Sequence, residues 1–331
     1  MKQKNCLITG ATGALGPSVV AAFETEGYRV SILCRKEPEH GLFSQGVRVI
    51  LGDILELDKV SEAVKGQDVI VHLASLLHKR KPTAAEQNEI KLVNVSGTEN
   101  LVLASQRENV SRFLLASTIA VYGYGQKICL RETSATHPET IYGTTKIEAE
   151  NIVLNAKRSD GSPLATVLRL SAVYGPRVKG NYQTLLHGLA RGRFVPVGDG
   201  KNRRTLVHTD DVARAFCVVA EIENAAGNIY NVTDGEHHEL QKIIEAMCQA
   251  LGRGTPRVAL PVPPIRGVLS TADFLVSLTG KRLDLSGMLE KYLEEVVVEG
   301  KKIQEIGFEP RIKLREGWAE TVRQLRDSGQ L

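Results

Sequence analysis

A tyrosine and a lysine four residues apart form the pair in this sequence best suited to moving protons. Of the eight tyrosines, Tyr142 alone is followed by a lysine at the fourth position, Lys146. On a helix this spacing puts the phenol and the ammonium on one face, one turn apart. A phenol titrates near ~10 in water, and an ammonium ~6–7 Å away would stabilise the phenolate by roughly 2–3 kcal/mol, which is about two pKa units. We therefore expect Tyr142 to exchange a proton with a substrate hydroxyl while hydride moves to or from a nicotinamide ring.

Hydroxyl side chains at the end of a predicted strand supply a third catalytic candidate. The strand expected over residues 112–116 runs directly into Ser117 and Thr118. A hydroxyl at this point could hydrogen-bond the reacting oxygen and hold it for Tyr142, although serine and threonine at strand ends are also common turn formers. From the order of the residues alone, either Ser117 or Thr118 could take this role.

A glycine-rich turn follows the first predicted strand. Thr9-Gly10-Ala11-Thr12-Gly13-Ala14-Leu15-Gly16 lies between a strand at residues 5–9 and a helix at residues 15–26. Gly10 permits the tight turn, Gly13 lets the backbone approach a pyrophosphate, and Gly16 allows the helix to pack close to the sheet. The N-terminus of that helix then faces the anion. Strand, turn and helix in this order predict a dinucleotide-binding unit, with Thr12 and Leu15 as further contacts.

Two further strand ends are expected to line the cofactor. Asp53 and Ile54 follow the strand at residues 47–51, where the carboxylate could accept a hydrogen bond from an adenine amino group or form an ordinary turn. Small residues after the fourth strand leave room for a cofactor to cross the sheet edge. The candidates there are Leu73, Ala74 and Ser75. We interpret His72, just before them, as a packed strand histidine and not as a ligand.

The end of the second predicted strand bears on the choice between NAD and NADP. An enzyme that uses NAD usually has an acidic residue there, which bonds both ribose hydroxyls. This chain instead has Cys34-Arg35. Arg35 could contact a 2′-phosphate, so the cofactor is expected to be NAD or NADP, with NADP favoured. The alternative is that Arg35 is a solvent-facing loop residue.

Short β-branched runs alternate with helical patterns in the first half of the chain, which is typical of an α/β fold with a doubly wound parallel Rossmann sheet. Strands are expected at residues 5–9, 29–33, 47–51, 68–73, 112–116 and 165–170, and helices at 15–26, 57–64, 86–108, 140–157, 210–221 and 240–251. Beyond residue 170 the pattern indicates a second, smaller mixed α/β lobe, in which Pro261-Val262-Pro263-Pro264 is predicted to be an extended connector. We expect a dinucleotide-binding domain at residues 1–171 and a substrate-binding lobe at 172–331, with parts of 204–233 returning to the large domain.

Composition argues against several classes of protein. The 331 residues are 42% hydrophobic and 24% charged, as in ordinary globular proteins. Five scattered cysteines without a CxxC pair argue against a disulfide framework. The chain shows neither a signal peptide nor a membrane span, so we expect a cytoplasmic protein that binds no membrane. The histidines suggest no metal site, and His237 and His238 are expected in an exposed turn.

Charge gives one local indication. A net charge of +4 is too small and too evenly spread to indicate nucleic acid binding. Basic residues are nevertheless concentrated in the middle of the chain, between Arg169 and Arg204. They form either a solvated surface or a site for an anionic substrate such as a diphosphate.

In their order and spacing these motifs resemble the extended short-chain dehydrogenase/reductase superfamily and, more narrowly, the NAD-dependent epimerase/dehydratase family acting on sugar nucleotides. The matching segments are residues 9–16, 53, 72–75, 94–98, 117–123, 142–146, 168–177, 204–212, 307–310 and 314–322. The resemblance implies that Thr118 is the catalytic hydroxyl, that Ser117 lines the cofactor and that Lys146 also bonds the nicotinamide ribose. Asn94 would be a structural or cofactor-channel residue.

The resemblance also implies a substrate and a partner. A nucleotide-activated sugar would bind with its nucleotide part against Arg204, and Arg177 and Asn181 lie where family members line the substrate cleft. The helices around residues 94–108 and 142–157 resemble the pair through which family members form homodimers.

One departure from the family bears on the reaction. Dehydratases carry an Asp-Glu pair directly after the catalytic threonine, where this chain has Ile119 and Ala120, so elimination of water is not expected. The resemblance favours a nucleotide-sugar epimerase similar to UDP-glucose 4-epimerase. The alternative is an NADPH-dependent ketoreductase of a 4-keto nucleotide sugar, which would use the same residues and fits Arg35. A reductase of a non-sugar ketone and a non-catalytic dinucleotide sensor are the remaining hypotheses.

Overall fold

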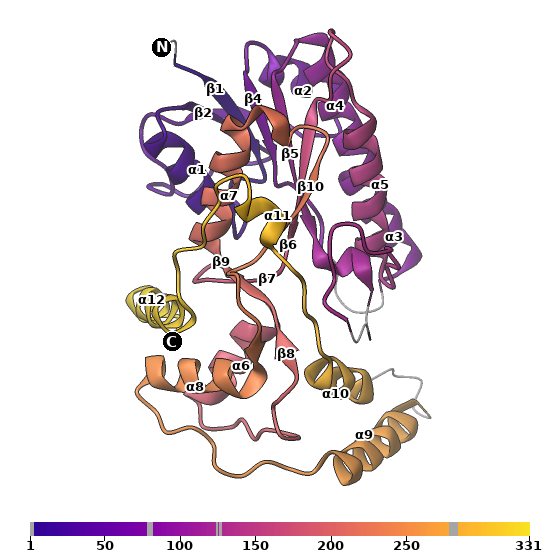
Figure 1. Ribbon diagram of the computed structural model, residues 1–331, viewed down its shortest axis with the longest axis vertical. Helices are drawn as coiled ribbons and strands as arrows, with labels where there is room; N and C mark the ends of the chain where they lie inside the picture. Colours follow the sequence, from indigo (N-terminus) through magenta and orange to yellow (C-terminus); the bar gives the residue numbers. More distant parts are fainter. Residues whose placement is uncertain (1–2, 78–81, 124, 126–127, 278–283) are drawn as a thin grey trace.

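A seven-stranded sheet forms the centre of the molecule in the computed structural model, which describes residues 3–77, 82–123, 125, 128–277 and 284–331 (Figure 1). The strands follow the order β10-β6-β5-β4-β1-β2-β3, and every neighbouring pair is parallel. Their bounds are β1 Asn5–Thr9, β2 Arg29–Cys34, β3 Arg48–Leu51, β4 Val69–His72, β5 Arg112–Thr118, β6 Ala165–Leu170 and β10 Ile229–Val232. The predicted doubly wound α/β fold is confirmed.

The strands are apolar because helices cover both faces of the sheet. Helices α1 (Gly16–Thr25) and α7 (Thr209–Glu221) lie on one face, and α2 (Leu57–Val64), α4 (Gly97–Arg107) and α5 (Ile141–Asn155) lie on the other (Figure 1). Along β1, Cys6 and Ile8 pack into the α1 side, whereas Leu7 packs into the α4 and α5 side. This alternation is the period of two that a strand imposes on its side chains.

The order of the sheet reverses between β1 and β4. Strands β2 and β3 follow β1 on one side, while β4, β5, β6 and β10 continue on the other. In open parallel sheets the crevice at the carboxyl ends of the strands next to such a reversal is where ligands bind. The glycine-rich turn after β1, the loop after β4 and the end of β5 all lie at this edge.

The helix predicted at residues 86–108 is present over nearly that range, but the prediction missed a π-helical turn within it. The structure has α3 (Ala84–Lys91), a π-helical turn η1 (Leu92–Ser96) and then α4. A capping box between Thr83 and Glu86 starts α3. A π turn inserts an extra residue into the helix and is frequent at functional sites; here it contains Asn94.

The prediction of an extended connector at residues 261–264 is wrong. Helix α9 (Val262–Ser277) begins inside this segment. Proline is tolerated in a first helical turn because the N–H groups there have no partner within the helix. Consecutive prolines can therefore open a helix as well as form an extended link.

A smaller mixed lobe lies beyond the carboxyl ends of the strands (Figure 1). Two small sheets pair β7 (Ala172–Tyr174) with β9 (Leu206–His208), and β8 (Arg203–Arg204) with β11 (His238–Glu239). The remaining helices are η2 Ile119–Tyr122, α6 Asn181–Ala190, η3 Glu223–Ala225, α8 Leu240–Leu251, α10 Leu285–Leu293, α11 Lys301–Gln304 and α12 Leu314–Asp327. A separate apolar core joins α6, α8 and α12. The domain boundary at residue 171 stays a prediction.

Candidate active site

The glycine-rich turn is packed against the loop that follows β4. Gly10 has a positive φ of 71°, and a Cβ atom there would come within 2.5 Å of the Ala74 nitrogen. A Cβ at Gly16 would lie 1.8 Å from the Ala11 oxygen, so α1 can approach the turn only with glycine at this place. Thr12 and Gly13 are exposed and Leu15 is half-buried. The turn thus presents backbone to the crevice beside the N-terminus of α1, which suits a pyrophosphate.

Replacing Gly10 by alanine is expected to weaken dinucleotide binding by tenfold or more, roughly 1.4 kcal/mol, because the new methyl group displaces the loop after β4. The matched control is Gly66→Ala, since Gly66 has a similar φ of 72° but no atom within 4 Å of the added Cβ. Fluorescence titration with the dinucleotide measures both variants. Equal affinities in the two variants would contradict a role of the close contact between Gly10 and Ala74 in dinucleotide binding.

Asn94 joins the loop after β4 to helix α5. Its Oδ1 accepts hydrogen bonds from Ser75 Oγ at 3.1 Å and from Leu76 N at 2.8 Å. Its Nδ2 donates to Leu76 O at 3.2 Å and to Thr145 Oγ1 at 3.0 Å. One side chain therefore fixes the predicted cofactor-lining loop relative to the helix that carries Tyr142. The resemblance suggested a structural role for Asn94, but these partners could not be read from the sequence.

His72 is a packed strand histidine, as interpreted from the sequence. Its Nδ1 lies 2.7 Å from Thr9 Oγ1 and its Nε2 lies 3.0 Å from Thr98 Oγ1. Burial, with a smaller contribution from the charge of Lys146, lowers the pKa of His72 to about 3. The ring is therefore neutral near pH 7, and its two nitrogens bond β1 and α4 to β4.

Tyr142 and Lys146 lie in the first turns of α5, one turn apart. Thr140 Oγ1 caps this helix by accepting from Gly143 N at 3.1 Å. Burial raises the pKa of Tyr142 to about 12, opposed by a hydrogen bond with Ser75. Burial also lowers the pKa of Lys146 to about 8, opposed by the charge of Glu150. The sequence argument expected a lowered phenol pKa, but in the free protein burial raises the pKa of Tyr142 instead. Near neutral pH the pair is a protonated phenol beside an ammonium.

Thr118 ends β5 next to the start of α5. Its Oγ1 accepts from Ala120 N at 3.2 Å and so begins the short helix η2. A Cβ at Gly143 would lie 3.0 Å from Ala120 O, so the turn after Thr118 packs directly against the residue after Tyr142. Ser117 points the other way: its buried hydroxyl donates to Glu150. Contact of Ser117 with a cofactor stays a prediction.

The remaining cofactor candidates lie at the ends of β2 and β3. Arg35 is exposed directly after the buried Cys34. Asp53 Oδ1 accepts from Leu55 N at 3.0 Å and forms a turn. Ile54 is buried, and a Cβ at Gly97 of α4 would come within 2.5 Å of its Cδ1. Contacts of these residues with an adenosine stay predictions.

The three predicted substrate contacts lie further along the chain. Arg177 is exposed and lines a surface groove between α1, α7 and α12, and Asn181 is exposed at the start of α6. Arg204 is half-buried and donates to the carbonyl oxygens of Lys291 at 2.5 Å and Tyr292 at 3.2 Å. Within the described part of the chain, these three side chains share no hydrogen bond or ion pair with the catalytic candidates. Their role in binding substrate stays a prediction.

One histidine expected in an exposed turn is buried. His238 Nε2 lies 2.6 Å from Asp234 Oδ2, and this carboxylate is the main group that raises the pKa of His238 against the effect of burial. His238 pairs across β11 and β8 with Arg204. The contact between His238 and Asp234 was not predicted from the sequence, because it depends on the turn at Gly235 that brings the Asp234 carboxylate to the histidine. Across the described ranges no cluster of His, Cys, Asp or Glu that could hold a metal ion was found.

The parallel sheet, its glycine-rich turn at the point of reversal and the Tyr142–Lys146 pair define an oxidoreductase-type enzyme of the extended short-chain dehydrogenase/reductase class. Residues 6–233 match the sequence profile of the NAD-dependent epimerase/dehydratase family. The chain belongs to this family. In the residues that the structure describes, no helix has the length and apolar character to cross a membrane.

The similarity to individual relatives covers nearly the whole chain. The chain is 26% identical to UDP-glucose 4-epimerase of Vibrio cholerae, over 97% of this chain and 95% of the relative. It is 24% identical to N-acetyl-alpha-D-glucosaminyl-diphospho-ditrans,octacis-undecaprenol 4-epimerase of Escherichia coli O157:H7, over 96% and 94%. Among solved structures, MoeE5 in complex with UDP-glucose and NAD is similar, with 25% identity, a TM-score of 0.77 and coverage of 98% of this chain and 99% of the other.

Proposed function

We propose that this protein is an NAD(P)-dependent epimerase of a nucleotide sugar, which inverts a sugar carbon by reversible hydride transfer. The observation that carries this proposal is the packing of the Thr118 turn against the first turn of α5. It places the turn that follows Thr118 next to the helix that carries Tyr142, at the edge of the sheet where a dinucleotide would bind. Two 4-epimerases among the relatives support the carbon at position 4 as the reacting centre.

The dinucleotide would lie along the backbone of Gly10, Gly13 and Gly16; added Cβ atoms would collide with the protein at Gly10 and Gly16. When bound, the nicotinamide supplies the acceptor and donor of hydride. Tyr142 takes the proton from the sugar hydroxyl. It returns the proton to the ketone oxygen after the keto sugar has rotated to present its other face. Thr118 holds the reacting oxygen, and the Lys146 ammonium stabilises the phenolate while it exists.

Two apolar residues support epimerisation over dehydration. Ile119 and Ala120 follow Thr118 in the short helix η2. Neither side chain can take or give a proton, so the acid and base that elimination of water requires are missing from these positions. The ketone formed at the site would be reduced again and not dehydrated.

A ketoreductase of a 4-keto nucleotide sugar is the second candidate, and Arg35 is the observation that favours it. Arg35 is exposed at the carboxyl end of β2, where no acid is present to bond the ribose hydroxyls. A guanidinium there suits the 2′-phosphate of NADPH. An enzyme that consumes NADPH once in each turnover would need such a contact.

Arg35→Ala is expected to weaken NADPH binding roughly 10–100-fold while NADH affinity stays within about twofold, because one charge-assisted hydrogen bond is lost. Fluorescence titration with both dinucleotides measures the change. Lys36→Ala is the matched control, since it removes the same charge from the next exposed residue. A loss of the same size for NADH and NADPH would contradict a phosphate contact.

The substrate is proposed to be a uridine diphosphate sugar. UDP-glucose is bound by the structural relative, and Arg177, Asn181 and Arg204 are the candidates for contacts with its nucleotide and diphosphate. In this structure Arg204 is held by Glu294, at 3.9 Å, and by two carbonyls. A cytoplasmic location and a homodimer through α4 and α5 remain parts of the proposal.

The released cofactor tests the proposal. Freshly purified protein is denatured and the dinucleotide set free is identified by mass. About one equivalent of NAD per chain would support a cofactor recycled within the site, and hence an epimerase. An empty site that binds NADPH more tightly than NADH would instead favour the ketoreductase.

A further inference from the structure

A buried ion pair lies behind the candidate catalytic lysine. Glu150 of α5 and Arg169 of β6 have side chains only 2% and 4% exposed. Arg169 Nε lies 3.0 Å and 3.2 Å from the two carboxylate oxygens of Glu150, and its Nη2 lies 2.7 Å from Oε2. Ser117 of β5 donates a further hydrogen bond to the same carboxylate. Charge-assisted and neutral hydrogen bonds from two neighbouring strands therefore fix the Glu150 carboxylate in place.

A second set of contacts fixes the arginine. The Arg169 guanidinium lies 4.9 Å from the centre of the Tyr122 ring, and Nη1 is 3.5 Å from the carbonyl oxygen of Glu132. The Tyr122 hydroxyl donates to Asn231 Oδ1 at 2.8 Å. Residues of β5 and β6 thus contact the carboxylate, while residues of η2 and β10 support Arg169 from behind. An ion pair costs more free energy to form in the interior than at the surface. The many contacts around Glu150 and Arg169 therefore suggest a role other than stabilising the fold.

Glu150 follows Lys146 by one helical turn, which puts the two side chains on the same face of α5. Lys146 is 2% exposed, and burial disfavours its ammonium. Among the described residues, Glu150 from its own helix and the neutral His72 from β4 interact electrostatically with Lys146, and Tyr142 precedes it by one helical turn. Glu150 is the anion in this set, and its charge opposes the effect of burial on Lys146.

We propose that Glu150, held by Arg169 and Ser117, is a positioning residue that keeps Lys146 in its ammonium form beside Tyr142. Because Arg169 and Ser117 occupy the carboxylate, Glu150 acts on Lys146 through its charge and leaves the ammonium free to face the phenol. The cluster thereby sets the upper pH limit of the reaction. This inference rests on the proposed function for the role of Lys146 in catalysis, but its physical content can be measured without a substrate.

Titration of Lys146 tests the inference directly. Protein labelled with [ε-13C]lysine is followed by NMR between about pH 6 and pH 11, and the Lys146 signal is assigned by its loss in Lys146→Met. Glu150→Gln should lower the midpoint of Lys146 by roughly one to two pH units, because it removes the anion and leaves Arg169 unpaired. The pH at which turnover declines should fall by the same amount.

Two further variants separate this effect from loss of structure. The double variant Glu150→Gln with Arg169→Met removes both charges and leaves neither one buried without a partner, so it should stay folded even if Glu150→Gln alone unfolds. The double variant should lower the Lys146 midpoint by about half as much as Glu150→Gln. Glu148→Gln removes the same charge from the exposed part of α5, where Glu148 pairs with Lys91 at 3.6 Å, and should leave the midpoint unchanged.

The outcomes distinguish this inference from the proposed function. A Lys146 midpoint that stays within about 0.2 units of the wild-type value in the double variant overturns the inference, even if the enzyme turns over a sugar nucleotide normally. A midpoint that falls as expected in a protein that acts on no sugar nucleotide supports the inference and contradicts the proposed function.

Discussion

Tyr142→Phe is expected to reduce turnover of the nucleotide sugar ~100-fold or more, the usual size of the loss when a general acid–base group is removed. Phenylalanine keeps the ring, so the free energy of unfolding and the affinity for the dinucleotide should change little. The free protein holds the phenol protonated, because burial raises the pKa of Tyr142 to about 12. Phenolate therefore has to be favoured by the bound cofactor together with Lys146. Steady-state kinetics at saturating dinucleotide measures the effect.

The control for this variant is Tyr28→Phe. Tyr28 precedes β2 at the opposite edge of the sheet and donates a hydrogen bond to Glu221. Its replacement removes a buried hydroxyl of the same kind but should leave turnover per folded molecule unchanged. Wild-type turnover in Tyr142→Phe would refute the assignment of the general acid–base.

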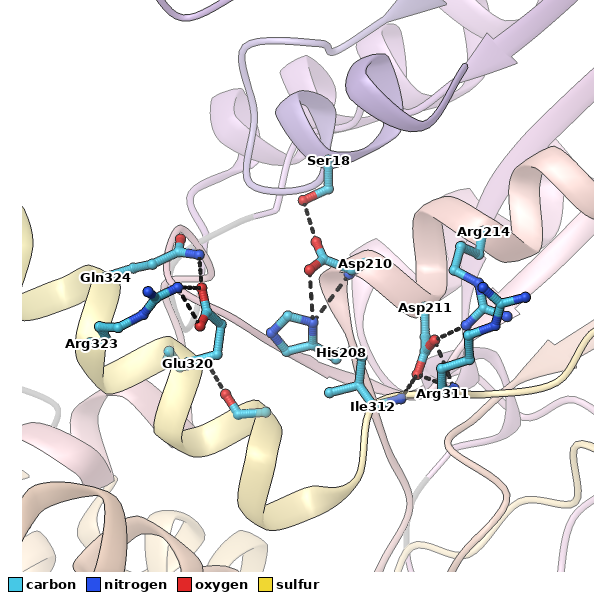
Figure 2. Close-up of polar contacts among 12 residues, drawn as sticks. Ser18, His208, Asp210, Asp211, Arg214, Arg311, Ile312, Glu320, Arg323 and Gln324 are labelled. Atoms are coloured by element: carbon cyan, nitrogen blue, oxygen red, sulfur yellow. Dashed lines mark hydrogen bonds and ion pairs between the residues drawn. The ribbon is translucent and has the colours of Figure 1, made fainter. Parts of the chain in front are cut away.

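Asp211→Ala is expected to lower the free energy of unfolding by roughly 3–5 kcal/mol, because it removes the buried acceptor of two backbone donors and of the Arg214 guanidinium. Asp211 is 0% exposed and accepts from Arg214 Nη1 at 2.6 Å. It also accepts from the backbone nitrogens of Arg311, at 3.0 Å and 3.1 Å, and Ile312, at 2.9 Å. Figure 2 shows this carboxylate joining α7 to the segment that leads into α12. Urea unfolding measures the loss.

Asp210→Ala provides the matched comparison. The neighbouring carboxylate accepts from Ser18 Oγ at 2.9 Å and lies 3.6 Å from His208 Nδ1 (Figure 2), but it is 53% exposed. Water can replace these contacts, so we expect a change within about 1 kcal/mol. If the two variants lost equal stability, the buried hydrogen bonds of Asp211 would not be what holds the C-terminal segment.

The sheet could be predicted from the sequence because its signals are local. Each strand is a short apolar run, and β1 and β6 were predicted with the bounds that the structure has. The π turn at Asn94 and the helix that starts at Val262 were missed. Neither has a local signal of its own: a π turn keeps the composition of the helix around it, and prolines suit both an extended segment and a first helical turn.

In the candidate site, too, the local features could be predicted from the sequence and the contacts between distant residues could not. The glycine-rich turn and the Tyr142–Lys146 pair are each encoded within a few residues. The contacts that fix them are not, since Asn94 bonds Thr145 and Arg169 bonds Glu150 across 51 and 19 positions. Such pairs depend on which helices and strands become neighbours in the fold. That Ser117 lines the cofactor stays a prediction, whereas the bond of its hydroxyl to Glu150 is set by the packing of α5 on β5.

The most direct test of the account follows a single hydrogen. UDP-glucose and UDP-N-acetylglucosamine, each deuterated at C4 of the sugar, are incubated with the protein without added dinucleotide, and the products are analysed by NMR. The account predicts a product inverted at C4 that retains its deuterium on the same carbon, because Tyr142 exchanges only the hydroxyl proton. Loss of deuterium to solvent, or no inversion here together with consumption of NADPH in a separate incubation with a 4-keto nucleotide sugar, would contradict epimerisation by hydride transfer within the site.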